Sequence, residues 1–441
     1  MEALAETKSV YLREHEALPS DRPAWLEALH RRGIEDFEAV GFPNRRQEAW
    51  RKTDLSQITD AHYRAVSKPG AVGAELSNSV GATGPGYRLV FVDGRLDRSL
   101  SDLEDLPAGL TVASLAEYGA DAPERLTGVL GRLADTAANP FAALNTAFFR
   151  DGAFVHVARG AAIERPVVLV HVATAREEPH AIYPRTVVQV EEGAEVKLVE
   201  RFIGADEVPA LIAPVTELHA AQGAIVSYYR LQEEGSATRH LGVVHARAER
   251  DASVRMHSMS AGGRLARVDI HADIADEGAE VLLDGLYLTA GRQFSDHHTW
   301  VNHRTPHGTS RQNFRGVLQG RSETVFDGLV KVFKDAQKTD AQQQNRNLVL
   351  DRMALAHSNP RLEIYADDVK CAHGSTVGEL EEDALFYLRS RGIAPDEARG
   401  LLTMAFASEV LEGIRVAEVR DHMMRVLLRY LPGDTAIEEL E

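Results

Sequence analysis

The hexapeptide EEGAEV at Glu191–Val196 returns almost unchanged as DEGAEV at Asp276–Val281. Two related phrases lie between them, QGAIV at 222–226 and DASV at 251–254. When the four phrases are aligned on their valines, the aligned residues are Val196, Val226, Val254 and Val281, which lie 30, 28 and 27 residues apart. A steady period of this length is typical of a solenoid in which each repeat contributes one coil.

From about residue 152 onward, short runs rich in Val, Ile and Leu follow one another with almost no helical periodicity. Coils of this length built only from strands predict a parallel β-helix, in which the strands of neighbouring coils pair. A long β-sandwich is the alternative. Sandwiches seldom keep a steady period, and hairpin signals such as Asn-Gly are scarce in this region, so the β-helix is favoured.

Helical patterns flank the β region on both sides. Residues 1–150 are expected to be mostly helical, with a Gly-, Ser- and Pro-rich linker or flexible loop at 68–86. The β-helix is expected to occupy residues 151–379. Residues 380–441 return to helical spacing and predict two or three packed amphipathic helices. These helices would either cap the open end of the solenoid or present a face to a partner.

Composition excludes several classes of function. A net charge of -17 leaves no general basic surface for nucleic acid or an anionic membrane. No apolar run is long enough to span a membrane, and the N-terminus lacks the basic-then-apolar pattern of a signal peptide. The single cysteine cannot form an internal disulfide, which is compatible with a reducing compartment. A cytoplasmic location is therefore expected.

The single cysteine lies in the stretch Arg361–Gly378, RLEIYADDVKCAHGSTVG, two positions before His373. The alternation of apolar and polar residues in LEIYADDV predicts a strand. On a strand, residues i and i+2 share one face at a spacing of about 7 Å. Cys371 and His373 are therefore candidates for metal or sulfur chemistry. The structural alternative is a cysteine that packs as a small apolar residue beside a hydrogen-bonded histidine.

A second candidate is the histidine-rich stretch Asp296–Gln312. Its histidines are His297, His298, His303 and His307. Imidazole suits Zn, Fe or Ni. The spacing is unfavourable, however, because adjacent histidines point to opposite faces of a strand, and Pro306 prevents a helix from pairing the last two. Stacked polar residues in a solenoid turn are the preferred interpretation.

Signatures of common catalytic sites are missing. The chain has no GxSxG elbow and no GxxxxGK[ST] loop, so neither a serine nucleophile nor ATP hydrolysis is expected. Carboxylates such as Glu192 and Glu195 could serve a carbohydrate-active β-helix, but they recur in phase with the repeat and are interpreted as solvated turns. The polar run at 342–347 is interpreted as a side-chain ladder between coils.

Several segments together carry a resemblance to a known family. They are PNRRQEAWRKTDL at 43–55, SDHHTWVNHRTPHGTSRQNFRGVL at 295–318, QNRNLVL at 344–350, RLEIYADDVKCAHGSTVGEL from Arg361, and DALFYLRSRGI at 383–393. The chain resembles the SufB/SufD family of iron–sulfur cluster assembly proteins over residues 40–415. The KCAHG segment resembles the SufD members of that family rather than their SufB paralogues.

The resemblance implies a mainly β fold, with a right-handed parallel β-helix between helical N- and C-terminal regions. It implies a scaffold rather than an enzyme, which works in a complex with a SufB-like paralogue and a SufC-like ATPase. In that family the C-terminal helices, here 380–441, dock the ATPase, and the β-helix ends of the two paralogues meet. His373 would lie at this interface and support a nascent cluster together with a cysteine of the SufB-like chain, and Cys371 matches a neighbouring family cysteine.

Ligand count leads to the same expectation of a partner. Iron–sulfur clusters normally take four protein ligands, mostly thiolates, with histidine an accepted substitute on some irons. One cysteine per chain cannot hold a cluster, so a transient cluster on Cys371 or His373 would be shared with a partner chain and not held tightly by this chain alone. A homodimer of the isolated chain remains an alternative. The alternatives are a β-helix enzyme acting on polysaccharide and a homodimeric metal-binding protein that uses the histidine-rich stretch.

Overall fold

One turn of the chain explains the repeated phrases. In successive coils the same turn position adopts the left-handed conformation, with φ of 66° at Gly193 and Gly223, 55° at Asp251 and 75° at Gly278. Glycine adopts this conformation without strain, and aspartate tolerates it better than most residues. The backbone N–H of each of these residues donates to a carbonyl of the next coil, for example Gly193 to Gln222 at 2.9 Å. The repeat therefore marks a turn that stacks from coil to coil.

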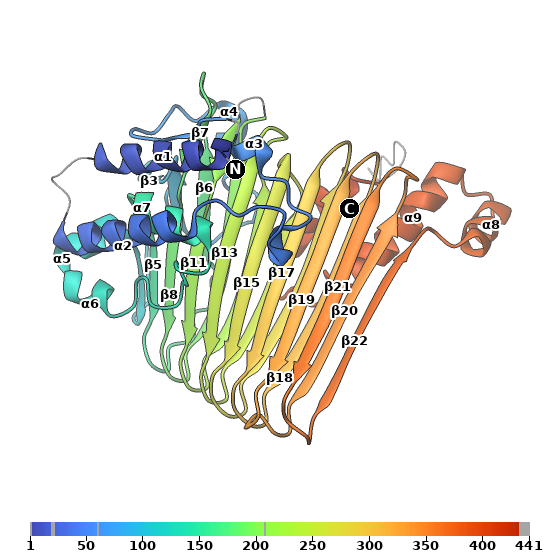
Figure 1. Cartoon of the computed structure of the whole chain (residues 1–441). Coiled ribbons are helices and arrows are strands. Elements are labelled where there is room, and N and C mark those ends of the chain that lie inside the picture. Colours follow the sequence, from blue (N-terminus) through green and yellow to red (C-terminus); the bar gives the residue numbers. More distant parts are fainter. Residues whose placement is uncertain (1, 19–22, 60, 207–208, 432–441) are drawn as a thin grey trace.

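The computed structural model describes residues 2–18, 23–59, 61–206 and 209–431. Its core is a parallel β-helix flattened into two sheets, seen as the long row of strands in Figure 1. From β5 onward each coil contributes a long strand to each sheet, and these strands pair in parallel with those of the neighbouring coils. The predicted parallel β-helix is confirmed, and the β-sandwich is excluded.

The first sheet has the order β21-β19-β17-β15-β13-β11-β8-β5-β4. Its strands are β4 (Leu110–Ser114), β5 (Gly152–Val157), β8 (Arg185–Val190), β11 (Val215–Ala220), β13 (Arg239–Ala248), β15 (Leu265–Ile274), β17 (Phe294–His303), β19 (Glu323–Val332) and β21 (Leu355–Ile364), with β1 (Arg64–Ala65), β7 (His180–Ile182) and β10 (Ala210–Ile212) beside this path. The second sheet has the order β22-β20-β18-β16-β14-β12-β9-β6-β2-β3. Its strands are β2 (Tyr87–Val92), β3 (Arg95–Leu96), β6 (Val167–Ala173), β9 (Glu195–Gly204), β12 (Ile225–Glu233), β14 (Ser253–Ser260), β16 (Glu280–Thr289), β18 (Thr309–Leu318), β20 (Asp340–Val349) and β22 (Lys370–Gly378).

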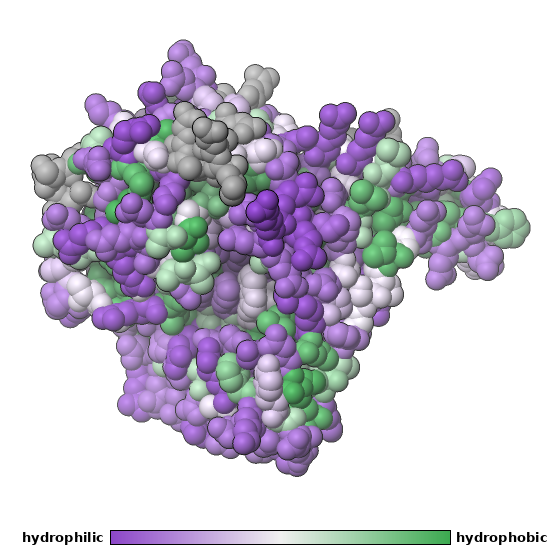
Figure 2. Space-filling model, in the orientation of Figure 1, coloured by the Kyte–Doolittle hydropathy of each residue, from purple (hydrophilic) through white to green (hydrophobic). Residues whose placement is uncertain are grey.

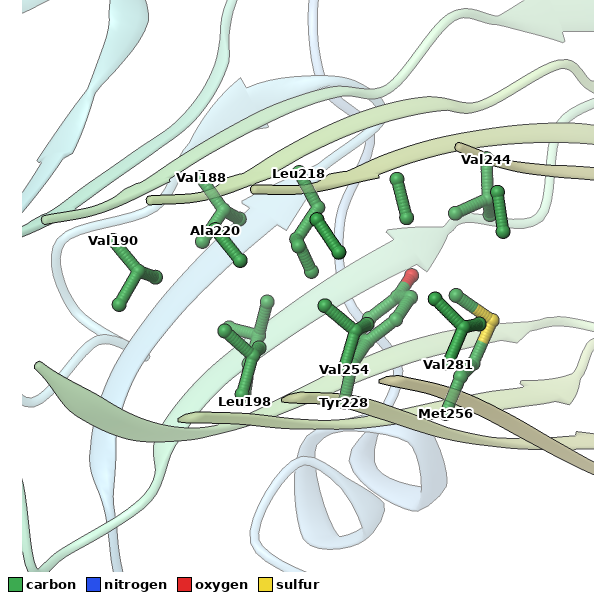
Figure 3. Packing of buried hydrophobic residues seen from close by; sticks show 14 of the residues in the cluster. Val188, Val190, Leu198, Leu218, Ala220, Tyr228, Val244, Val254, Met256 and Val281 are labelled. Carbon is green, nitrogen blue, oxygen red and sulfur yellow. The ribbon is translucent and has the colours of Figure 1, made fainter. Parts of the chain in front are cut away.

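The aligned valines of the sequence form one column of the second sheet. Val226 pairs with Val196 on one side and Val254 on the other, and Val254 pairs with Val281. All four side chains are buried in the core between the two sheets. Figure 3 shows Val254 and Val281 facing residues of the first sheet such as Val244 across this core. The spacing of the valines in the sequence therefore equals the offset between paired residues of neighbouring coils.

Helices lie before and after the long strands. They are α1 (Glu2–Glu16), α2 (Ala24–Val40), the 3-10 helix η1 (Glu48–Trp50), α3 (Ser56–Thr59), α4 (Ala74–Ser79), α5 (Leu115–Asp121), α6 (Pro123–Thr127), α7 (Pro140–Phe148), α8 (Glu382–Ser390), α9 (Pro395–Ser408) and α10 (Ala417–Leu428). The stretch 68–86, expected to be a linker or flexible loop, instead contains α4, and its Gly70 N–H donates to Asp93. None of the described helices is long and apolar enough to cross a membrane.

The two ends of the β-helix differ in what covers them. At the N-terminal end β4 and β3 pair antiparallel with β5 and β2, and the buried helix α7 packs against α2 in a second apolar core. At the C-terminal end, β21 and β22 each have a neighbour on one side only among the described strands. Helices α9 and α10 pack on the outer face of the second sheet, where Leu411, Met423 and Leu427 join a third apolar cluster. They do not bury the last coil.

Candidate functional site

Strand β22 carries both candidate residues and is the last strand of the second sheet. Cys371 pairs with Ala341 and His373 pairs with Gln343 on the neighbouring strand β20. Ala341 and Gln343 are both buried in the β-helix interior. Because paired residues of a parallel ladder share a face, Cys371 and His373 face the same interior. The strand and the shared face are as the sequence predicts.

The absence of a further coil in the described chain turns this interior face into surface. Cys371 is half-buried and packs against the apolar core, as Leu362 and Val369 also do. His373 is exposed. Burial raises the pKa of the Cys371 thiol, and the nearby Asp340 carboxylate raises it further. Cys371 therefore carries its proton at neutral pH, and it would become a thiolate ligand only when metal binding displaces that proton to solvent.

Apolar side chains surround this open end. Leu355 and Ile364 on β21 are 53% and 41% exposed, Val377 on β22 is 51% exposed, and the following Tyr365 is 58% exposed. The residues of the preceding coil that pair with Ile364 and Val377, which are Val332 and Asn347, are buried. Large apolar side chains left exposed together at one end of a fold mark an interaction site. Cys371 and His373 thus lie at the uncovered end of the β-helix core rather than in a closed pocket.

A polar network lies behind the open end. The Tyr287 hydroxyl donates to Asn347 at 2.6 Å and receives a hydrogen bond from Asn345 at 2.8 Å. The Ser358 hydroxyl on the last coil donates to the side-chain Oδ1 of Asn345 at 2.6 Å. Asn345 and Asn347, two inward members of the polar run, therefore bond across coils as in the predicted ladder, whereas Gln342 and Gln344 are exposed.

The histidine-rich stretch is structural in the described chain. Three of its histidines, His297, His298 and His303, lie on strand β17, so the expected solenoid turn is wrong for them, and only His307 occupies a turn, with φ of 60°. Burial lowers the pKa of His297 to about 3 and of His303 to about 4, so both rings are neutral. They lie against Ser260 and Ser310, at 3.3 and 2.8 Å. His298 pairs with Asp296 at 3.0 Å.

Within the described ranges, no three His, Cys, Asp or Glu side chains come together in a group that could hold a metal ion. This holds for the histidine-rich stretch and for Cys371 with His373. The open end therefore offers at most two ligands from one chain, which is fewer than an iron–sulfur cluster takes. Any metal centre at this position would be completed by another molecule.

Sequence reasoning missed the residue immediately behind His373. Gln343 lies inside the polar run and was not distinguished from its neighbours, although strand alternation places it on the opposite face from Gln342 and Gln344. The pairing partner of a strand residue depends on the length of each turn, which varies between coils. The 30-residue offset from Gln343 to His373 became clear only from the register.

Comparison with known proteins agrees with this architecture. Residues 171–406 match the family model described as SUF system FeS cluster assembly, SufBD core domain, and residues 1–169 match that of the SufBD protein N-terminal region. The iron-sulfur cluster assembly SufBD family protein slr0076 of Synechocystis is 32% identical, over 89% of this chain and 88% of the relative. The iron-sulfur cluster assembly protein SufD of Escherichia coli is 29% identical over 91% and 92%, and SufD of Bacillus subtilis is 24% identical over 92% and 94%.

Proposed function

The chain belongs to the SufBD family of iron–sulfur cluster assembly proteins, and from this premise we propose that it is the SufD-like scaffold subunit of a SUF complex. Its task would be to support a nascent cluster at the junction with a SufB-like paralogue. The SufD relatives match along nine-tenths of their length, which supports the SufD assignment. The comparisons give no support to a polysaccharide-active enzyme.

One observation carries the proposed junction. The last coil exposes both the free edges of β21 and β22 and the side chains that other coils bury. An exposed strand edge is a template for pairing with another chain. A second β-helix that ended in the same way would satisfy the free backbone groups and cover the apolar rim together. A SufB-like paralogue is a partner of this shape.

At such a junction His373 and Cys371 would be the residues of this chain nearest to the cargo. Iron would take a lone pair of the His373 imidazole, and Cys371 would contribute a thiolate after releasing its proton. The remaining ligands would come from cysteines of the partner. The cluster is a transient cargo in this scheme, and the chain acts as a scaffold rather than as a catalyst.

We also propose that residues 380–441 dock a SufC-like ATPase. Helix α8 has no buried residue and exposes Phe386 and Tyr387, at 72% and 57%. Figure 2 shows apolar side chains gathered on the part of the surface that carries α8 and α9. Arg315 on β18 forms an ion pair with Glu409 at the end of α9. Movement of α9 would therefore displace β18, which is the second strand from β22 in the sheet. ATP-driven movement would then shift the junction between conformations.

The test is an anaerobic affinity purification of the full chain from its native cell extract, with bound proteins identified by mass spectrometry. We expect a SufB-like paralogue and a SufC-like ATPase. A variant with Phe386→Ser and Tyr387→Ser should lose the ATPase and keep the paralogue. Recovery of the chain alone or only as a homodimer would contradict the proposed complex.

A further inference from the structure

The strongest unexplained feature of the interior is Gln343. Its side chain is 1% exposed, and neither its Oε1 nor its Nε2 has a hydrogen-bond partner among the described residues. A buried polar group without a partner destabilises the fold, because it has lost its hydrogen bonds to water. Its inward neighbours on the same strand, Asn345 and Asn347, are by contrast fully engaged in the network with Tyr287. Gln343 therefore lacks a partner that the complete site should supply.

The fold makes room for the Gln343 amide. A Cβ on Gly328, which lies on β19 of the first sheet, would overlap the Gln343 Nε2 atom. The amide therefore reaches across the interior to the opposite sheet, over a position with no side chain. The next coil places Pro360 beyond Gly328 and His373 beyond Gln343. His373 is the residue of the next coil that pairs with Gln343, and adjacent strands lie about 4.8 Å apart.

The coil behind Gln343 continues the pattern. Gln312 is its pairing partner on β18, and the Gln312 Oε1 accepts a hydrogen bond from the Thr299 hydroxyl at 2.7 Å. The Gln312 Nε2 is buried and has no partner in the described chain. Stacked amides at strand spacing form hydrogen-bonded ladders. The Gln312 Nε2 and the Gln343 Oε1 are thus a donor and an acceptor on neighbouring coils, and the Gln343 Oε1 has two lone pairs that can accept.

We propose that Gln343 is a positioning residue for His373: its Oε1 accepts the N–H of one imidazole nitrogen and turns the lone pair of the other toward the open end. Metal-binding histidines commonly donate their second N–H to an oxygen acceptor, which fixes the tautomer and the ring orientation. The ligand class is a divalent metal ion that imidazole suits, such as Fe(II). The value of this orientation for cluster assembly rests on the proposed function, whereas the hydrogen bond itself does not.

The test is nuclear magnetic resonance of the full chain without metal, with ¹⁵N-labelled histidine, at about pH 8, where an ordinary histidine is neutral. The His373→Ala variant identifies the resonance. We expect a ring N–H proton of His373 that is protected from exchange with water. Gln343→Leu should remove this signal, because leucine fills similar space without an acceptor. Gln343→Glu should retain it through a carboxyl oxygen.

Gln342→Leu is the matched control, because it changes the same residue type one position away on the exposed face. It should leave the His373 signal unchanged. Gly328→Ala is a second probe that keeps the amide but pushes it aside, and it should weaken the signal even if Gln343→Leu does not fold. An unprotected His373 N–H in the wild type, or an unchanged signal in both Gln343→Leu and Gly328→Ala, would overturn the proposal. Because no cluster is present, this result is separate from whether His373 is required for assembly.

Discussion

Cys371 occupies the same column of the β-helix as Val281 and Val254, which lie three and four coils earlier. In those coils the position is a buried core site. At Cys371 it is half-buried, because the described solenoid has no further coil to cover it. A core position has thus become a surface position, and a thiol and an imidazole stand where valine and leucine stand earlier. Residue chemistry and the end of the solenoid together make the candidate site.

Replacing His373 by alanine should block cluster assembly while leaving the fold intact. The side chain is exposed, so the free energy of unfolding should change by no more than about 1 kcal/mol, the net worth of the hydrogen bond proposed to Gln343. Cluster formation on the purified complex, followed by its visible absorption, should fall to background. His307→Ala removes another exposed histidine from a turn and should have no effect. Normal assembly with His373→Ala would rule out the ligand role.

Glu200 provides a residue-scale prediction about pH. Burial alone would raise the pKa of this carboxyl, but hydrogen bonds from His171 and Thr186 and the charge of His171 bring it down to about 2. A lowered folded-state pKa stabilises the protein above the ordinary glutamate value of about 4.3, and this stabilisation is lost as the pH falls toward 2. The contribution of the ionised form is about 3 kcal/mol.

The difference in unfolding free energy between wild type and Glu200→Gln should therefore shrink as the pH is lowered from 5 to about 2.5. Urea denaturation at several pH values measures it. Glu177→Gln, at an exposed loop position, is the control for the same substitution outside the Glu200 network. A constant difference for Glu200→Gln would show that His171 and the hydroxyls do not hold the carboxyl ionised.

At the scale of elements, the sequence was informative wherever one coil constrains the next. The recurring Gly and Asp turn sites predicted the parallel pairing and even the register of the valine column. The sequence was uninformative about contacts between segments that lie far apart along the chain. The docking of α10 on the outer face of the second sheet depends on outward residues such as Tyr229 and Leu286, which alternation alone would assign to solvent. The histidines of β17 were misplaced in a turn for a similar reason, since their burial depends on both sheets.

The packing of consecutive strands yields a prediction at Gly285. This glycine faces the interior on β16, and a Cβ there would overlap the ring of its pairing partner Phe314, which is fully buried. Gly285→Ala should therefore destabilise the protein by about 1–3 kcal/mol. Adding Phe314→Leu should recover part of that loss, because the smaller side chain leaves the space that the methyl group needs.

Thermal or urea unfolding of the two single variants and the double variant measures the coupling, which should be about 0.5–3 kcal/mol in favour of the pair. Gly374→Ala on β22 is the control, because a Cβ at that position meets nothing within 4 Å. It should be neutral to within about 0.5 kcal/mol. Strictly additive effects of Gly285→Ala and Phe314→Leu would contradict the proposed overlap.

At the scale of the whole molecule, the two ends of the β-helix have opposite designs. Antiparallel strands and helices close the first end, and the last coil keeps its edges and apolar rim exposed in the described structure. In a solenoid each coil is stabilised chiefly by its neighbours, so a coil with one neighbour is the least stable. The candidate site therefore lies on the part of the β-helix that opens most easily and that gains most from a partner.

This asymmetry should be visible in amide hydrogen exchange. In the isolated chain, β21 and β22 should exchange faster than the central strands β13 and β15, because local opening of the last coil breaks contacts on one side only. Addition of a SufB-like paralogue should slow exchange in β21 and β22 and leave β13 and β15 unchanged. Addition of a SufC-like ATPase should instead slow exchange in α8. Protection of β22 in the isolated chain that rises with protein concentration would identify a second copy of the chain as the occupant, and protection independent of concentration would show that the last coil is not an open end.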